Sequence, residues 1–359
     1  MNPAVPPEQQ IHFLQQLQRL LNDGSFVATY KFALLHAIAD LAVLHGNDSG
    51  GELRLGTREI AEEIIELYWR QALPFPAGGT GTALVLRQNT GRQAAILVKI
   101  LQAQESCGTS LVRYRRRRSE WERLVREVDQ VVREMPLWRL QTVGNERLSF
   151  LYENVDTGNE ITLKPGVAFC LRAFYPLILD LVRGVWLRHV RTYNTAALGE
   201  SSELGAFLFG TGRGSLAVYQ PILVEVQNGT CFYCRSALHG AGEVDHFIPW
   251  TRYPVDLGHN FVLAHAGCNR SKSDHLAAEG HLEHWLSRNE AFSGVLASAF
   301  DAAGAAYSVA ASTQIGRWAY AHTSRIGGQV WEKGNLLRPL SPHWETLFLS
   351  SNTLVRSAW

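Results

Sequence analysis

Between residues 231 and 275 the chain reads CFYC (231–234), DHFIPW (245–250) and HNFVLAHAGCNRSKSDH (259–275). Two pairs of possible metal ligands share one spacing there, Cys231 with Cys234 and His265 with Cys268. Two such ligands separated by two residues fit a tight turn and suit a tetrahedral zinc ion. A folded segment this short rarely holds together without a metal or disulfides. The stretch therefore predicts a small metal-stabilised domain.

The four pair residues predict a structural zinc site. Cys231, Cys234, His265 and Cys268 would fill all four tetrahedral positions, so the site would be closed and would serve the fold. Zinc binding contributes ~10–16 kcal/mol in small zinc-finger peptides. Two alternatives remain open: the cysteines are redox-active or simply packed, and His265 packs without binding metal. A thioredoxin-like dithiol would begin a helix after a strand in an α/β unit, which this context does not match.

The order Cys-x2-Cys, Asp-His-x-x-Pro, Asn and Cys-Asn-x-x-Lys resembles the HNH endonuclease family, also called His-Me finger or ββα-metal nucleases. The resemblance covers about residues 228–278. Many zinc-bearing members have cysteine at the place of His265, and the third signature position is Asn269 where others have histidine. The positions that carry the resemblance are Cys231, Cys234, Asp245, His246, Pro249, Asn260, Cys268, Asn269 and Lys272.

The same residues suit phosphodiester hydrolysis, which needs a deprotonated water and positive charge on the phosphate. His246 is the expected general base, because unperturbed imidazole has a pKa of ~6.5 and such catalysis contributes ~10²–10⁴-fold in rate. Asp245 and Asn269 offer hard oxygen ligands for Mg²⁺ or Mn²⁺, and the resemblance implies that they hold a single catalytic ion. Neighbouring strand residues point to opposite faces, so Asp245 and His246 serve one site only if the strand is twisted or bulged.

Three further residues are expected to support this site. Asn260 is expected to pin the loop before it and to help orient the backbone of His246. If a helix begins at Cys268, Lys272 shares a face with Asn269 and can reach the bound phosphate, and Arg270 is a weaker candidate for that contact. Solvated positions on the helix are the alternative for both cations, and a buried pair that only supports packing is the alternative for Asp245 and His246.

A dense positive run lies far from this motif. It comprises Arg113, Arg115, Arg116, Arg117 and Arg118, interrupted by Tyr114. It precedes an amphipathic helical pattern, and cations at a helix N-terminus oppose the macrodipole, so helix stability does not account for them. Guanidinium groups bind phosphates irrespective of sequence, which predicts contacts to the DNA backbone. The alternative is a solvated run, or pairing with Glu120, Glu122 and Glu127.

Composition limits the protein class. The chain has 359 residues, 34 Lys and Arg against 33 Asp and Glu, and five cysteines. Because positive and negative charges nearly balance, electrostatic attraction to nucleic acid must come from a local patch of positive charge. An odd number of cysteines in a long chain is a poor disulfide framework, and reduced metal-binding cysteines suit a cytoplasmic protein. The N-terminus lacks a signal-peptide pattern, and the apolar segment 171–187 carries charges that oppose a membrane span.

The periodicity of apolar residues predicts a mainly α protein, α+β overall, with a small embedded zinc-stabilised ββα-metal domain. Helices are expected at 8–22, 26–45, 57–69, 91–104, 119–134, 167–193, 281–288 and 292–303, and Thr57 is the expected N-cap of its helix. A hairpin is expected at 148–163, with its turn at 156–159. The expected domains are 1–145 (helical), 146–215 (hairpin, helices and connector), 216–290 (nuclease) and 291–359 (helical extension).

The sequence therefore predicts a metal-dependent DNA endonuclease of the HNH type. The resemblance implies a setting in bacterial defence, restriction or mobile-element biology. Protein partners or self-association through the helical regions are further expectations, and no membrane partner is expected. The main alternative is a zinc-stabilised module that binds nucleic acid without cutting it. A scaffold with a vestigial motif is the third possibility.

Overall fold

The structure is a computed structural model that describes residues 5–24, 26–76, 84–154, 158–198, 203–210 and 213–350. It contains two compact units, Met1–Gly210 and Thr211–Trp359. The expected α+β class is confirmed, since helices dominate and the strands form two-stranded antiparallel sheets. No helix in the described part of the chain combines the length and apolar character needed to cross a membrane.

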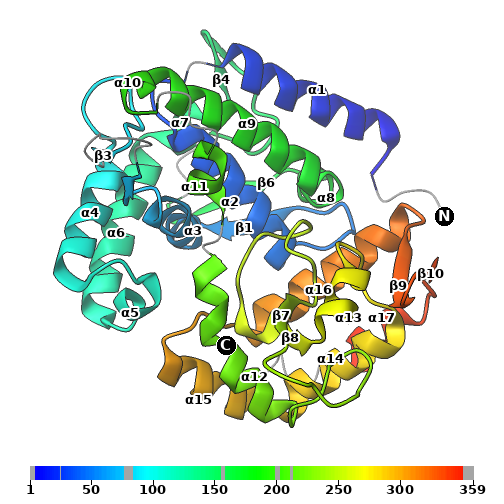
Figure 1. Cartoon of the computed structure of the whole chain (residues 1–359). Helices are drawn as coiled ribbons and strands as arrows, with labels where there is room; N and C mark the ends of the chain where they lie inside the picture. The colour runs from blue at the N-terminus through cyan, green and yellow to red at the C-terminus, as the bar shows by residue number, and fades with distance from the viewer. Residues whose placement is uncertain are drawn as a thin grey trace. The chain divides into compact units, whose positions relative to one another are not determined.

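The first unit is built around α2 (Tyr30–His45). Every residue from Phe32 to Val43 is buried, and helices α3 (Thr57–Trp69), α8 (Val167–Ala173) and α9 (Tyr175–Tyr193) pack on it (Figure 1). The helix begins at Tyr30 and not at 26, because Thr29 donates its backbone N–H to Gln88 in a strand-like contact (3.1 Å). The other helices of this unit are α1 (Pro7–Asp23), α4 (Ala95–Cys107), α5 (Leu111–Arg115), α6 (Arg118–Glu134), α7 (Pro136–Arg139), α10 (Thr195–Leu198) and α11 (Leu204–Phe209).

Two helix boundaries differ from expectation. The N-cap of α3 is Gly56 and not Thr57, because the Glu59 carboxylate accepts the backbone N–H of Gly56 (3.1 Å) and closes the first turn one residue earlier. The helix expected over 167–193 is divided into α8 and α9 at Phe174. Pro176 explains the break, since proline lacks an N–H and clashes with the preceding turn of a helix.

The hairpin expected over 148–163 is only partly present. Strand β6 (Glu160–Leu163) pairs along its whole length with β1 (Leu53–Gly56), while its contact with the expected partner is a single bridge between Tyr152 and Leu163. Residues 155–157, which include part of the expected turn, lie outside the described residues. The remaining strands of the unit are β2 (Pro74–Phe75), β3 (Leu84–Val85), β4 (Thr142–Val143) and β5 (Glu146–Arg147), paired β2 with β3 and β4 with β5.

The second unit contains a short ββα arrangement made of β7 (Glu243–His246), β8 (Phe261–Ala264) and α13 (Ala266–Lys272), which lie together in Figure 1. One face of the hairpin joins an apolar cluster in which Phe261 and Leu263 pack with Tyr219, Leu223 and Phe300. The surrounding elements are η1 (Arg213–Val218), α12 (Gln220–Val226), η2 (Gly258–Asn260), α14 (Glu279–Ala291), α15 (Ser293–Ala303), α16 (Val309–Arg325), β9 (Gln329–Lys333), β10 (Leu336–Pro339) and α17 (Trp344–Ser350).

The sequence predicts a helical extension over 291–359, but this part also contains strands. Strands β9 and β10 form a hairpin, and β9 contacts the segment that follows α13: Trp331 donates its backbone N–H to Leu276 (2.8 Å) and accepts that of Ala278 (2.7 Å). The four-domain division stays a prediction. Its boundary at 215/216 lies close to the division between the units, and those at 145/146 and 290/291 lie inside a unit.

Candidate metal centre and nuclease-like site

The predicted Cys3His ligands converge. One ligand atom from each of Cys231, Cys234, His265 and Cys268 lies within 4.8 Å of the others, so the group could hold a metal ion. Sulfur and imidazole ligands in this number are those of a closed structural zinc site. No second group of three His, Cys, Asp or Glu side chains converges in this way within the described ranges.

Local backbone structure explains the convergence. Cys231 and Cys234 lie on a turn closed by two hydrogen bonds, Cys231 N–H to Ser236 (2.9 Å) and Arg235 N–H to Cys231 (3.0 Å). His265 follows β8 directly and caps α13, and Cys268 lies in the first turn of that helix. The turn is tied to the hairpin because Phe232 donates its backbone N–H to Leu263 (2.8 Å).

His265 is oriented as a ligand. Its Nε2 lies 3.1 Å from the carbonyl oxygen of Ala237, to which it donates, and its Nδ1 lies 3.3 Å from the Cys234 sulfur. A metal-binding histidine commonly donates its second ring N–H to a carbonyl or carboxylate, which fixes the ring and its tautomer. The geometry favours binding over the packed alternative for His265.

The thiols of the cluster differ in acidity. Burial opposes ionisation of Cys234, but hydrogen bonds from the Ser236 backbone and from the side chains of Cys231, Ser236 and His265 lower its pKa to about 6. Burial and the neighbouring Cys231 raise the pKa of Cys268 to about 12. Because a metal binds thiolates, a cation would have to displace the proton of Cys268, and its affinity would rise with pH.

Asp245 is held from the α13 side of the hairpin. Its Oδ2 accepts the Tyr233 hydroxyl (2.5 Å) and lies 3.0 Å from Lys272 Nζ. Lys272 is fully buried and also donates to the backbone carbonyl of His246 (2.9 Å). The ammonium group of Lys272 is enclosed in this arrangement, and the expected contact of Lys272 with a substrate phosphate stays a prediction. The group neutralises Asp245 and joins α13 to β7.

His246 lies on the other face of β7. The four residues of β7 pair with β8 in continuous register, so the bulge that would bring Asp245 and His246 to one face is not formed. The Nε2 of His246 lies 2.7 Å from Asp256 Oδ1, and the imidazole meets the Phe261 ring edge-on at 4.6 Å between centroids. The side chains of Asp245 and His246 therefore lie on opposite faces of β7.

The two asparagines occupy different positions. Asn260 binds the backbone of Ile248 at both polar groups, accepting N–H (2.8 Å) and donating to the carbonyl (3.0 Å). It thus pins the loop as expected, but through Ile248, while the carbonyl of His246 is bound by Lys272. Asn269 lies on α13 and donates to Glu243 (2.9 Å), two residues before Asp245 on β7.

Two side-chain oxygens between β7 and α13 are left without a hydrogen-bond partner among the described residues. Asp245 Oδ1 and the Asn269 carbonyl have no hydrogen-bond partner among the described residues, and neither is a fully enclosed atom. Both extend from the face between β7 and α13, since Glu243 and Asp245 alternate with His246. Mg²⁺ commonly takes one or two protein oxygens and keeps water in its other positions.

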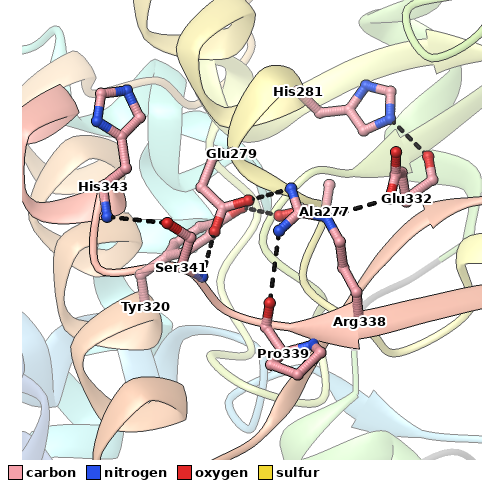
Figure 2. Close-up of polar contacts among 9 residues, drawn as sticks. All are labelled: Ala277, Glu279, His281, Tyr320, Glu332, Arg338, Pro339, Ser341 and His343. Carbon is pink, nitrogen blue, oxygen red and sulfur yellow. Dashed lines mark hydrogen bonds and ion pairs between the residues drawn. The ribbon is translucent and has the colours of Figure 1, made fainter.

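The C-terminal hairpin packs beside the turn that carries Cys231 and Cys234. Trp331 of β9 packs edge-on against Tyr233, with ring centroids 5.1 Å apart. Figure 2 shows how the hairpin is fastened: the Glu279 carboxylate on α14 binds the Arg338 guanidinium and accepts the Ser341 backbone N–H (2.5 Å). Glu279 thus fastens the hairpin, and among the described residues it has no hydrogen bond or ion pair with Asp245 or His246.

Sequence reasoning missed Asp256, Tyr233 and Glu243 as neighbours of the predicted site residues. Tyr233 was marked only by its place inside the Cys-x2-Cys turn, and Glu243 by its alternation with Asp245. Asp256 lies in the irregular segment between Pro249 and Asn260, where no periodicity predicts side-chain direction. The one signal in the sequence was that Asp256 is an acidic residue in the loop that leads back to β8.

Some arginines of the 113–118 run form ion pairs within the first unit. Arg115 pairs with Glu66 (3.0 Å), and Arg117 pairs with Glu120 (3.3 Å) and binds a backbone carbonyl. The pairing alternative therefore holds for Arg117, whereas Arg115 is paired with a glutamate that the sequence did not indicate. Arg113 and Arg118 are exposed and have no ion pair within the described ranges, and Arg116 is exposed with contacts of its own. Arg270 of α13 is also exposed.

We expect the double substitution Arg113→Ala and Arg118→Ala to weaken DNA binding without changing stability. If each guanidinium neutralises one phosphate, the slope of log affinity against log salt should fall by about 2. The matched control replaces two exposed arginines outside the run, Arg54 and Arg147, by alanine. Equal slopes for the two double variants in a salt titration would exclude this surface as a phosphate contact.

The chain matches one family model. Residues 10–204, more than half of the 359 residues, match the family described as a domain of unknown function, DUF8808, so the chain belongs to this family. The matched range lies within the first unit and does not include the Cys3His cluster. No curated protein and no solved structure matches the chain.

Proposed function

We propose that this chain, a member of the DUF8808 family, is a metal-dependent endonuclease of the HNH type that hydrolyses DNA phosphodiester bonds. One observation carries the proposal. On a ββα arrangement beside a Cys3His cluster, His246 is held at Nε2 by Asp256 while its Nδ1 is open to solvent. A purely structural zinc knot needs no such imidazole.

Each part of the arrangement has a role in this reaction. His246 Nδ1 accepts a proton from water, the water oxygen bonds to phosphorus, and one P–O ester bond breaks. The leaving oxygen takes a proton from solvent. Asp245 and His246 lie on opposite faces of β7, so a divalent cation held by Asp245 and Asn269 would supply positive charge to the same phosphate only if that phosphate lies at the end of the strand. Cys231, Cys234, His265 and Cys268 would hold a zinc ion that takes no part in the chemistry and would fix the turn that carries Tyr233.

A second candidate function is supported by the state of Asp245. Its charge is already neutralised by the buried Lys272, so Asp245 and Lys272 satisfy each other inside the protein. A zinc-stabilised module that binds nucleic acid without cutting it would keep this pair for folding alone. The open Asp245 Oδ1 and Asn269 carbonyl favour the enzyme, because packing requires neither to remain without a partner.

We expect purified protein to nick or linearise supercoiled plasmid when Mg²⁺ or Mn²⁺ is added, and not without added divalent cation. Asn269→Ala should lower cutting roughly 10- to 100-fold at limiting Mg²⁺, since an interaction with a charged group contributes about 1.5–3 kcal/mol. The control is Asn335→Ala, an exposed asparagine in the turn between β9 and β10. Retarded but uncut plasmid under all conditions would support the binding module.

A further inference from the structure

We propose that Asp256 is the positioning residue of His246, and that its carboxylate holds the imidazole in the tautomer protonated at Nε2. The inference rests on the proposed function and adds a residue to its site. The His246 Nε2 to Asp256 Oδ1 distance is 2.7 Å, and the two side chains are 14% and 16% exposed. A short contact between two largely buried groups restricts the ring more than an exposed pair would.

The contact of His246 Nε2 with Asp256 determines the state of the other ring nitrogen, Nδ1. His246 Nδ1 has no hydrogen-bond partner among the described residues, and it is not one of the buried polar atoms left without a partner. It is therefore in contact with solvent. A neutral imidazole has one protonated nitrogen, so the proton donated to Asp256 leaves a lone pair on Nδ1. That lone pair is what a general base requires.

The ring is restrained on a second side as well. Phe261 of β8 meets the imidazole edge-on, and Phe261 is itself fully buried in the apolar cluster with Tyr219. Rotation of the His246 side chain would therefore break the contact with Asp256 and lose packing on Phe261. The imidazole has one favourable orientation in this environment.

The loop is fixed directly after Asp256. Gly258 donates its backbone N–H to Ala306 (2.9 Å), and Asn260 donates its backbone N–H to Leu257 (2.8 Å). A Cβ at Gly258 would lie 2.5 Å from the Phe300 ring, so only glycine lets the loop approach the apolar cluster this closely. This packing sets the position of Asp256 two residues earlier.

The carboxylate also acts after proton transfer. When Nδ1 takes the proton of water, the ring becomes an imidazolium, and Asp256 accepts a charge-assisted hydrogen bond from Nε2–H. The alternative is an ion pair that contributes only to folding. The two roles differ in what is lost on substitution: positioning changes kcat and the state of the ring nitrogens, while a folding role changes stability alone.

The experiment compares Asp256→Leu with a matched control, Glu279→Gln. Leucine has the same branched arrangement of four side-chain heavy atoms as aspartate, although it is larger, and it cannot accept Nε2–H. Glu279 is another buried carboxylate of the second unit, and it binds Arg338 and Ser341 far along the chain from His246 (Figure 2). A second variant, Asp256→Asn, keeps the shape and removes the charge in case leucine impairs folding.

Two measurements are made on each variant. In ¹⁵N-histidine-labelled protein, assigned with His246→Gln, we expect a slowly exchanging Nε2–H signal of His246 in wild type and Glu279→Gln, and its loss in Asp256→Leu. We expect kcat for DNA cleavage to fall about 10- to 100-fold in both Asp256 variants, with KM unchanged. Losses of this size are typical when a residue that hydrogen-bonds a metal-binding histidine is replaced. Glu279→Gln should keep the wild-type kcat.

The proposal is overturned if wild type lacks the Nε2–H signal, if Asp256→Leu keeps it, or if Glu279→Gln lowers kcat as much as the Asp256 variants do. These outcomes are distinct from failure of the proposed function. If wild-type protein binds but does not cut DNA, the nuclease proposal fails, and with it the catalytic role of Asp256. The Nε2–H signal then still decides whether Asp256 holds the ring.

Discussion

Cys234→Ser protein should lose its bound zinc and its folded Cys-x2-Cys turn. Zinc binding is worth ~10–16 kcal/mol in zinc-finger peptides, which equals or exceeds the ~5–15 kcal/mol stability of a typical domain. Metal analysis should find about one zinc ion per chain in wild type and much less in the variant. Hydrogen exchange should show the loss of protection concentrated between residues 229 and 242.

The expected unfolding is local because of how the hairpin packs. Phe261 and Leu263 of β8 belong to the apolar cluster of the second unit, so this strand has support that does not depend on metal. The turn that bears Cys231 and Cys234 is joined to β8 through the Phe232 backbone and the metal ligands, and outside β8 Tyr233 anchors it to Asp245. Loss of the ion should therefore release the turn first.

The control for this substitution is Cys107→Ser, which makes the same chemical change at a partly buried cysteine outside the cluster. It should keep the zinc content and the exchange pattern of wild type. Equal zinc content in Cys234→Ser and wild type would contradict the structural-metal assignment. A fall in both variants would show that the change from sulfur to oxygen acts through general stability.

The metal cluster was predictable from sequence because its information is local. Cys231 and Cys234 lie on one turn, and His265 and Cys268 lie at one helix start, so spacing alone nearly fixes each pair. The two pairs come together because the antiparallel β7–β8 hairpin brings residues 265–268 back beside the turn at 231–234. The helices were predictable for a similar reason, because the spacing of apolar residues that marks a helix such as α6 lies within the helix itself.

The arrangement around the proposed catalytic residues could not be read in the same way. Lys272 looks like a solvated or phosphate-binding cation on a helical pattern, yet the structure buries it against Asp245. Asp256 has no periodic context at all. The strand Glu160–Leu163 likewise pairs with Leu53–Gly56, a partner that no local pattern indicates. These features depend on tertiary packing and loop path.

The central claim is that His246 performs the chemistry while the Cys3His cluster serves the fold. Its most direct test is the single-turnover rate of DNA cleavage by wild type and His246→Ala, with zinc content and DNA affinity measured on the same samples. We expect the rate to fall about 10²–10⁴-fold with zinc content and affinity unchanged. Cleavage by His246→Ala at the wild-type rate would contradict the claim.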